Sequence, residues 1–491
     1  MKNGKLAIVL VLAIILTGAG ILRLYDLKEE SLWLDECFTL SYSSKPINLL
    51  VETLKKDVHP IGYYLPQHLL IDYFGTGEIT LRILSVFFGV LSVFLTHLLA
   101  RKIFSWKEGL LAAFFMAVSY TSILYSQEAK MYSMFAVFFL LSIISFLRFL
   151  EKPSLLNVVF FSLSTALLLY THIIGVVIVL LYVLYYLTGC VLRKKVDLIP
   201  RFVKEKEFSL SRFCAAAAII FLLYLPWLKI VVFYQFPLLY NFLGSKLIEK
   251  TGLDLLPVVV VGVGLLGVIY VTILYLILRN KINLTGIKQH FRLAFTFFSN
   301  EKVIFLSLLS FLILDFVVST YLFSSVSIIR FGFFLLPLFY IVFSRILLRL
   351  KKSSFATILF ILFMVSASLE LYMYYTFDSK EQFQEAAEYI EEHASTADVL
   401  FLHRATIAKL CFDYYYSGNV EEVRLLKAGE DDHLLVERVS GKRDAYLILS
   451  HNYHTKDYFT QKMSSLYELE EEKKFIGVTI YKYKVDVGRW S

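Results

Sequence analysis

The sequence predicts an α-helical polytopic membrane protein that carries a small α/β domain at its carboxyl-terminal end. Of its 491 residues, 58% are hydrophobic and only 18% are charged, and the mean hydropathy is +0.66. An ordinary soluble protein of this length is much less apolar. The apolar segments are long and lack the short alternating pattern of a membrane β-barrel, so we expect them to form helices.

Apolar runs that are long enough to cross a bilayer recur over the first three quarters of the chain. A helix needs about 20 apolar residues to span the hydrocarbon, and by this rule we expect about eleven transmembrane helices. The first run follows Lys2 and Lys5 and has no small-residue cleavage site, so we expect an uncleaved helix. The predicted spans lie near residues 6–24, 79–100, 108–123, 131–150, 155–170, 173–192, 213–232, 257–278, 303–323, 331–348 and 355–374.

The basic residues are distributed unevenly between alternate connections. With a cytoplasmic amino terminus, the inside connections hold roughly 22 Lys and Arg against roughly 8 outside, which is the positive-inside pattern. The net charge of +8 therefore reflects membrane orientation, and we expect no nucleic-acid partner. These observations predict a multi-pass plasma-membrane protein with the amino terminus in the cytoplasm and the carboxyl-terminal domain outside it.

The composition changes to that of a soluble domain near residue 378. We therefore expect residues 1–377 to form the transmembrane domain and residues 378–491 to form an extracytoplasmic α/β domain. Its predicted elements are one helix and three strands, at residues 382–393, 399–403, 446–450 and 475–485.

The first external loop, residues 25–78, is too long to be a simple connection, and long ordered loops are usually functional. It holds the adjacent carboxylates Asp35 and Glu36, which follow Trp33. Such a pair at the membrane surface could supply a general base. The alternative is a solvated acidic turn, since two acids in a polar loop cost nothing there.

On the predicted topology, the other polar candidates project to the same side of the membrane as Asp35 and Glu36. They are His59, Lys130, His172 and Arg330. The alternative is that these side chains only solvate helix ends or extend to the interface. One acid, Asp315, lies within the predicted ninth span, where an ionisable residue marks a site or a buried pair.

The four cysteines are Cys37, Cys190, Cys214 and Cys411. They include no CxxC pair, so the sequence indicates neither a zinc site nor a disulfide framework.

The order of these motifs resembles the GT-C class of polytopic glycosyltransferases that use polyprenyl-phosphate sugars, such as the protein O-mannosyltransferases and aminoarabinose transferases. The matching pieces are LWLDE at 32–36, His59-Pro60 before Tyr63-Tyr64, Arg82, EAKMY at 128–132, Tyr170 to His172, and Arg330 before Leu336-Pro337. The chain departs from the common pattern at Ile61, where a second proline is usual, and at Lys130, where an arginine is usual. Lysine cannot make the bidentate phosphate contact of arginine.

The resemblance implies a glycosyltransferase that moves a sugar from a dolichyl- or undecaprenyl-phosphate donor to a hydroxyl group of a protein, lipid or glycan, by inverting displacement at the outer surface. It implies that Asp35 is the base and that Glu36 orients the site. The implied residues for binding the donor phosphate or the substrate are His59, Arg82, Lys130, Tyr132, His172 and Arg330. No complete metal-ligand set is recognisable, although related enzymes use divalent ions, so the sequence leaves a metal open.

Two other functions stay open from the sequence alone. A multi-span transporter or flippase would explain Asp315 and the glycine-rich stretch at 262–267. It would leave the long first loop and the external domain without a role. An oligosaccharide or lipid-linked glycan transferase differs from the favoured single-sugar transferase only in the size of the donor.

Overall fold

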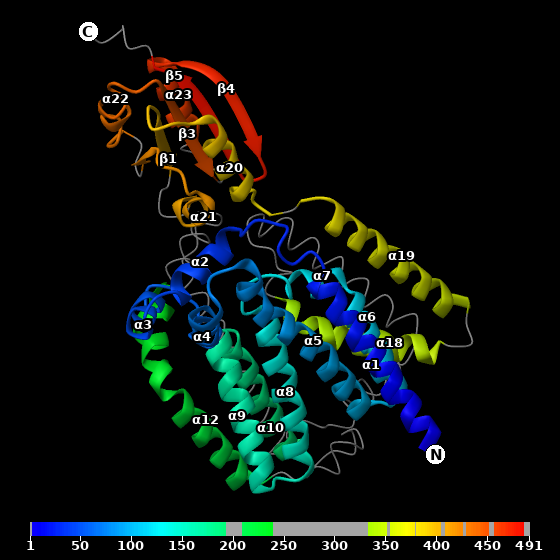
Figure 1. Ribbon diagram of the computed structural model, residues 1–491. Coiled ribbons are helices and arrows are strands. Elements are labelled where there is room, and N and C mark those ends of the chain that lie inside the picture. The colour runs from blue at the N-terminus through cyan, green and yellow to red at the C-terminus, as the bar shows by residue number, and fades with distance from the viewer. Residues whose placement is uncertain are drawn as a thin grey trace, which may run out of the picture.

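The computed structural model describes residues 2–192, 209–238, 332–350, 354–378, 380–403, 408–425, 429–450 and 456–485. It consists of a helical bundle with an α/β domain at the end opposite the amino terminus (Figure 1). Three short helices of the first loop lie between them. The predicted spans 257–278 and 303–323, together with Asp315 and Arg330, lie outside the described residues.

The other predicted spans coincide with helices. They are α1 (Lys2–Leu24), α5 (Glu78–Ile103), α6 (Trp106–Val118), α8 (Tyr132–Glu151), α9 (Leu155–Thr171), α10 (Gly175–Leu192), α12 (Leu210–Ile230), α18 (Leu336–Arg349) and α19 (Ser354–Thr376). In the described part of the chain, 5 helices are long and apolar enough to cross a membrane, and two apolar ones are shorter. A mostly helical chain with several candidate membrane spans is therefore confirmed, while the number eleven stays a prediction.

The bundle is built around α5 and α8, which contact each other and pack against α6 and α9 respectively. Small residues allow these helices to approach closely: Ala100, Ala112 and Ala113 are fully buried between them. The α6 helix ends at Val118, and a short helix, α7 (Tyr120–Leu124), follows it. This break leads the chain into the loop that carries Lys130.

The first external loop is ordered into three short helices, α2 (Leu34–Ser43), α3 (Ile47–Leu54) and α4 (Tyr64–Phe74). The α2 helix starts after the extended residue Trp33 and has Asp35 and Glu36 in its first turn. Carboxylates are favourable there because of the helix dipole. The α4 helix ends at Gly75, whose φ of 83° is easily adopted only by glycine.

The carboxyl-terminal domain is a mixed five-stranded sheet between two helical layers. Its elements are α20 (Phe383–His393), β1 (Val399–His403), α21 (Ala408–Tyr415), β2 (Glu421–Leu425), α22 (Leu434–Glu437), β3 (Asp444–Ser450), α23 (Lys456–Leu466), β4 (Glu468–Phe475) and β5 (Val478–Lys484). The strand order is β2-β1-β3-β5-β4. The first three strands are parallel, and β5 is antiparallel to β3 and β4. The predicted α/β character is confirmed.

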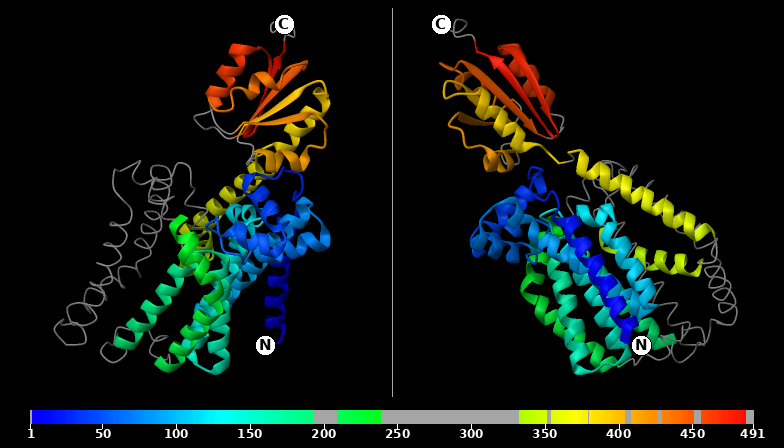
Figure 2. Two further views of the ribbon diagram at one scale, coloured as in Figure 1. Left: turned by 90° about the vertical axis from the view of Figure 1, so that its left-hand side faces the viewer. Right: turned by 45° about the vertical axis from the view of Figure 1, so that its right-hand side comes forward.

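Alternation along the buried strands gives the sheet two apolar faces. Leu400 and Leu402 of β1 pack with α20 and α21, whereas Val399 and Phe401 pack with α22 and α23. The first of these clusters also includes Leu32 from the first loop, so the core of the domain continues into the top of the bundle. Figure 2 shows the domain resting on the bundle end where α2 lies.

Candidate active site

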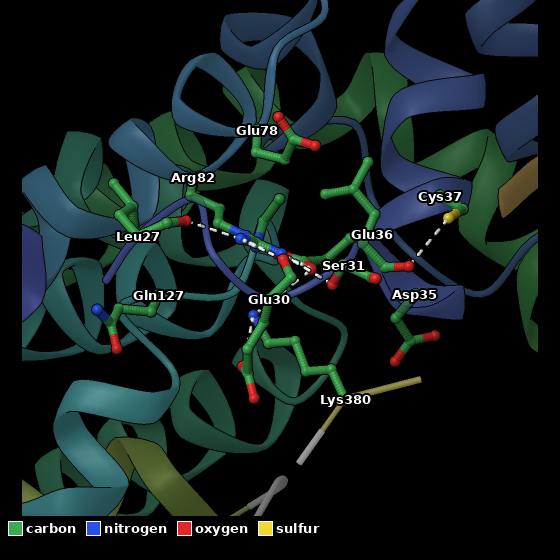
Figure 3. Close-up of polar contacts among 12 residues, drawn as sticks. Leu27, Glu30, Ser31, Asp35, Glu36, Cys37, Glu78, Arg82, Gln127 and Lys380 are labelled. Carbon is green, nitrogen blue, oxygen red and sulfur yellow. Dashed lines mark hydrogen bonds and ion pairs between the residues drawn. The ribbon is translucent and has the colours of Figure 1, made fainter. Parts of the chain in front are cut away.

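A buried ion pair joins the first loop to the bundle. Glu36 and Arg82 are 0% and 1% exposed, and two nitrogens of the Arg82 guanidinium bind the two Glu36 oxygens at 2.9 and 2.8 Å. The other N–H groups of Arg82 donate to backbone carbonyls of Leu27, Glu30 and Ser31 (Figure 3). All five donors of the guanidinium are thus used within the protein. The expected contact of Arg82 with the donor phosphate or the substrate stays untested, and the structure places its guanidinium in contacts within the protein.

Two more groups hold the Glu36 carboxylate. The backbone N–H of Ala129 donates to it at 2.9 Å, and the Lys380 ammonium lies 3.7 Å away. Burial alone would raise the pKa of Glu36, but the charges of Arg82 and Lys380 and the hydrogen bonds from Arg82 and Ala129 lower it to about 2. Glu36 is therefore ionised at neutral pH, and it joins α2, α5, the loop at 125–131 and the carboxyl-terminal domain.

Asp35 lies beside this junction but has a different environment. It is half-buried in the first turn of α2, and Figure 3 shows its carboxylate outside the Arg82–Glu36 ion pair. The charge of Asp35 acts on the hydroxyl groups of Tyr42 and Tyr64. The two adjacent acids therefore have separate surroundings. Glu36 is held inside the protein by an ion pair and hydrogen bonds. Asp35 lies near a group of polar side chains around Tyr42 and Tyr64.

That group includes Asp57 and His59, of which the sequence analysis named only the histidine. Asp57 Oδ1 lies 2.7 Å from His59 Nδ1 and also accepts hydrogen bonds from the backbone of Val58 and His59. Burial opposes ionisation of Asp57, but the hydrogen bond and charge of His59, with the charge of Lys130, hold its pKa well below the usual value. Asp57 therefore stays ionised and fixes the orientation of the His59 ring.

Lys130 is a buried cation next to Tyr64. It is 3% exposed, and its ammonium lies 6.0 Å from the centre of the Tyr64 ring. Within the described part of the chain it forms no ion pair. Its charge stabilises the Asp57 carboxylate. The neighbouring Tyr132, which starts α8, packs edge-on against Tyr125.

His172 is brought to the cluster by a close backbone approach. The N–H of Gly62 donates to the Tyr170 carbonyl at 2.8 Å, and a Cβ atom at position 62 would lie 2.4 Å from that oxygen. As a result the rings of His59 and His172 lie 6.4 Å apart. Burial, together with the charge of His59, lowers the pKa of His172 to about 3, so this ring is neutral at physiological pH.

The loop that carries Ala129 and Lys130 is held in place by Arg23 of α1. Its guanidinium donates to the last carbonyls of α6, at Met116 and Ala117, and to the hydroxyl groups of Ser122 and Ser126. A cation at the end of a helix is favourable because it satisfies free carbonyls. Arg23 was not predicted as part of the site, because a basic residue at the end of a predicted membrane span is common and gives no sign of a site.

The cysteine prediction was wrong in one respect. Cys37 of α2 and Cys411 of α21 form a disulfide with a Cα–Cα distance of 5.5 Å, although 374 residues separate them in the sequence. Spacing rules detect local cysteine pairs and give no signal for a bond between two domains. Cys214 is exposed on α12.

The structure thus brings together Asp35, His59, Lys130, Tyr132 and His172 at one end of the bundle, with Glu36 and Arg82 as a buried pair beside them. Arg330 stays a prediction outside the described residues. Among the residues described there is no group of three or more His, Cys, Asp or Glu side chains that could hold a metal ion. The expectation about a divalent ion stays untested.

Comparisons with known proteins concern the family and the fold. Residues 58–199 match the family model described as dolichyl-phosphate-mannose-protein mannosyltransferase. A comparison with curated protein sequences found no significant match.

Among solved structures, the chain is similar to the oligosaccharyltransferase AglB of Archaeoglobus fulgidus in complex with an inhibitory peptide and a dolichol-phosphate. The TM-score is 0.52 and the identity 13%, over 100% of this chain and 75% of that one. ArnT from Cupriavidus metallidurans gives a TM-score of 0.47 and 10% identity, over 98% of both chains. The chain therefore shares the fold of AglB, and its residues 58–199 match the dolichyl-phosphate-mannose-protein mannosyltransferase model.

Proposed function

We propose that this chain transfers a sugar from a dolichyl- or undecaprenyl-phosphate donor to a hydroxyl group on a protein, lipid or glycan. The observation that carries the proposal is the arrangement around Tyr64. The Lys130 ammonium lies over its ring, and the charges of Asp57 and Asp35 both act on its hydroxyl group. A carboxylate and a buried cation therefore flank one small region at the end of the bundle.

This pairing suits the chemistry of a lipid-phosphate sugar. The departing polyprenyl phosphate is a weak base, so its departure needs little protonation, and the site must supply a base and positive charge. In the proposed step, Asp35 takes the proton of the acceptor hydroxyl while that oxygen attacks the anomeric carbon. The bond from this carbon to the phosphate oxygen breaks, and the configuration inverts.

Lys130 and His59 are the groups proposed to bind the donor phosphate. A buried ammonium without an ion-pair partner among the described residues is suited to an incoming anion, because a charge-assisted contact in a dry site is strong. His59 is oriented by Asp57 through Nδ1, which leaves its other nitrogen for a ligand. Tyr132 and His172 line the same region, and Arg330 is retained as a proposed phosphate contact.

Glu36 and Arg82 are proposed to position the base. Their buried ion pair fixes the first turn of α2 against α5, and Asp35 is the residue before Glu36. Because neither side chain of the pair has solvent exposure, we assign them no contact with the substrate.

Several observations support placing the site on the outer surface of the plasma membrane. A disulfide forms and persists in oxidising compartments. The helix α2, which carries Asp35 and Cys37, and the helix α21, which carries Cys411, lie at the same end of the bundle (Figure 1). The positive-inside pattern of the basic clusters agrees with this orientation. The class of donor is supported by the dolichol-phosphate bound in the AglB complex and by the dolichyl-phosphate-mannose named in the family description.

Complementation tests the proposal. Cells lacking the gene would receive the wild-type chain, Asp35→Asn or, as a matched control, Asp72→Asn, which changes an aspartate with 58% side-chain exposure in the same region. Mass spectrometry of protein, lipid and envelope glycans should show a sugar that the wild type and Asp72→Asn restore and Asp35→Asn does not. Restoration by Asp35→Asn would refute the role of Asp35, and an unchanged glycan profile in the deletion strain would refute the function.

A further inference from the structure

The carboxyl-terminal domain contacts the short segment that carries Asp35. The backbone N–H of Leu34, one residue before Asp35, donates to Glu381 Oε2 at 3.0 Å. The backbone N–H of Leu32 donates to the Tyr415 hydroxyl at 2.7 Å, and the Ser31 hydroxyl donates to Glu385 at 2.9 Å. The Leu34 N–H lies in the first turn of α2, where the N–H groups of a helix have no partner within the helix. The domain therefore supplies a partner that α2 itself cannot provide.

A covalent bond reinforces these contacts. The disulfide joins Cys37, two residues after Asp35, to Cys411 in the domain. Both cysteines are buried in the apolar cluster that Leu32 shares with Phe383 and Phe412. Asp35 is therefore flanked in the sequence by two residues that are tied to the domain, Leu34 by a hydrogen bond and Cys37 by a disulfide.

Charge provides a third connection. The Lys380 ammonium, 8% exposed, lies 3.7 Å from Glu36 and 3.7 Å from Glu30. The next residue, Glu381, is braced by the turn between β4 and β5, because a Cβ atom at Gly477 would lie 2.6 Å from the Glu381 side chain. Gln382 exchanges hydrogen bonds with Ile476 in the same turn. Residues 380–382 therefore connect the β4–β5 turn of the sheet to the first turn of α2.

We infer that the carboxyl-terminal domain is a positioning element for the base, with Lys380 and Glu381 as its positioning residues and the Cys37–Cys411 disulfide as its covalent clamp. This inference rests on the proposed function, because it concerns the orientation of Asp35. A base must lie within hydrogen-bond reach of the proton it removes, and a displacement of about 1 Å can lower a rate by about 100-fold. The donor-phosphate contacts Lys130 and His59 lie on other segments and should be unaffected.

The first experiment compares Glu381→Ala with Glu381→Gln. Glutamine keeps an oxygen that can accept the Leu34 N–H, whereas alanine does not. With a saturating acceptor, Glu381→Ala should lower kcat by about 10-fold or more with an unchanged donor KM, and Glu381→Gln should stay within about threefold of the wild type. The matched control is Glu388→Ala, which removes an exposed carboxylate from α20, the helix that begins two residues after Glu381. A wild-type kcat in Glu381→Ala, or a change confined to donor KM, would overturn the inference.

The second experiment removes the clamp in the variant Cys37→Ser/Cys411→Ser, with Cys214→Ser as the control. Hydrogen–deuterium exchange of residues 31–40 is followed together with transfer. Faster exchange in this segment and a lower kcat support the clamp, and unchanged exchange and kcat overturn it. If this variant does not fold, the comparison of Glu381→Ala with Glu381→Gln tests the inference.

The exchange measurement separates this inference from the proposed function. If Asp35→Asn is active, the assigned role of the base fails, but faster exchange in Glu381→Ala would still show that the domain holds α2. If Asp35→Asn is inactive and Glu381→Ala exchanges and turns over normally, only the positioning inference fails. A rise in acceptor KM alone in Glu381→Ala would instead assign the domain to acceptor binding and overturn the inference.

Discussion

Removing Arg82 should destabilise the folded protein, because Glu36 would then be buried without its ion-pair partner. In Arg82→Met the carboxylate keeps the Ala129 N–H and the Lys380 ammonium at 3.7 Å but loses the bidentate contact. Breaking a buried ion pair by removing one partner costs about 3–5 kcal/mol. The pKa of Glu36 agrees in direction: against desolvation, which would raise it, Arg82, Lys380 and the Ala129 N–H lower it from 4.5 to about 2, so the folded protein favours the charged form.

The same pKa fixes the direction of the pH dependence. Because the folded state lowers the pKa of Glu36, its stabilisation is complete above the ordinary value and is lost as the pH falls from about 5 towards 2. In detergent, the thermal midpoint of Arg82→Met should lie about 5 °C below that of the wild type at pH 7. This gap should narrow as the pH falls, since Glu36 then becomes neutral in both proteins.

Two variants complete this test by thermal unfolding. Glu36→Gln with Arg82→Met removes both charges and should recover part of the lost stability. Lys102→Ala breaks a partly exposed ion pair with Glu151 and should cost less than about 1 kcal/mol. An Arg82→Met midpoint within one degree of the wild type at pH 7, or a gap that widens in acid, would refute the reasoning.

Three further predictions concern the elements around the cluster. Lys130→Met should raise the donor KM at least about 10-fold, because a charge-assisted phosphate contact is lost, while Lys130→Arg should retain binding. Equal donor KM values for Lys130→Met and the wild type in steady-state transfer would contradict this prediction. Gly62→Ala should push the first loop off the Tyr170 carbonyl and lower kcat by about 10-fold or more, with Gly77→Ala, which has open space around it, as the control. Arg23→Met should lower the free energy of unfolding by about 3 kcal/mol, since it leaves buried carbonyls and hydroxyls unsatisfied, and an unchanged denaturation midpoint would count against that role.

The bundle could be predicted from the sequence because hydropathy reports local burial in lipid. Apolar runs end at polar residues such as Lys102 and Glu151, and the helices end there too. The internal structure of the first loop was not predicted. Its helices are short, and tertiary contacts such as the burial of Leu50 and Leu54 stabilise them.

The candidate site could be predicted only as a set of residue positions. Topology and family resemblance selected Asp35, Lys130 and His172, but they could not show that Glu36 pairs with Arg82. That pairing depends on how the first loop folds onto α5, 46 residues further along the chain. One local signal was not used: Asp57 stands two residues before His59, and the structure shows its carboxylate 2.7 Å from His59 Nδ1.

A single-turnover transfer assay directly tests the proposal that Asp35 is the base of an inverting sugar transfer. The purified chain in nanodiscs would be mixed with a labelled polyprenyl-phosphate sugar and a hydroxyl acceptor, and donor binding, transfer and the anomeric configuration of the product would be measured. We predict an inverted product from the wild type, and from Asp35→Asn the same donor affinity with transfer slower by about 100-fold or more. Transfer by Asp35→Asn at the wild-type rate, or a product with retained configuration, would contradict it.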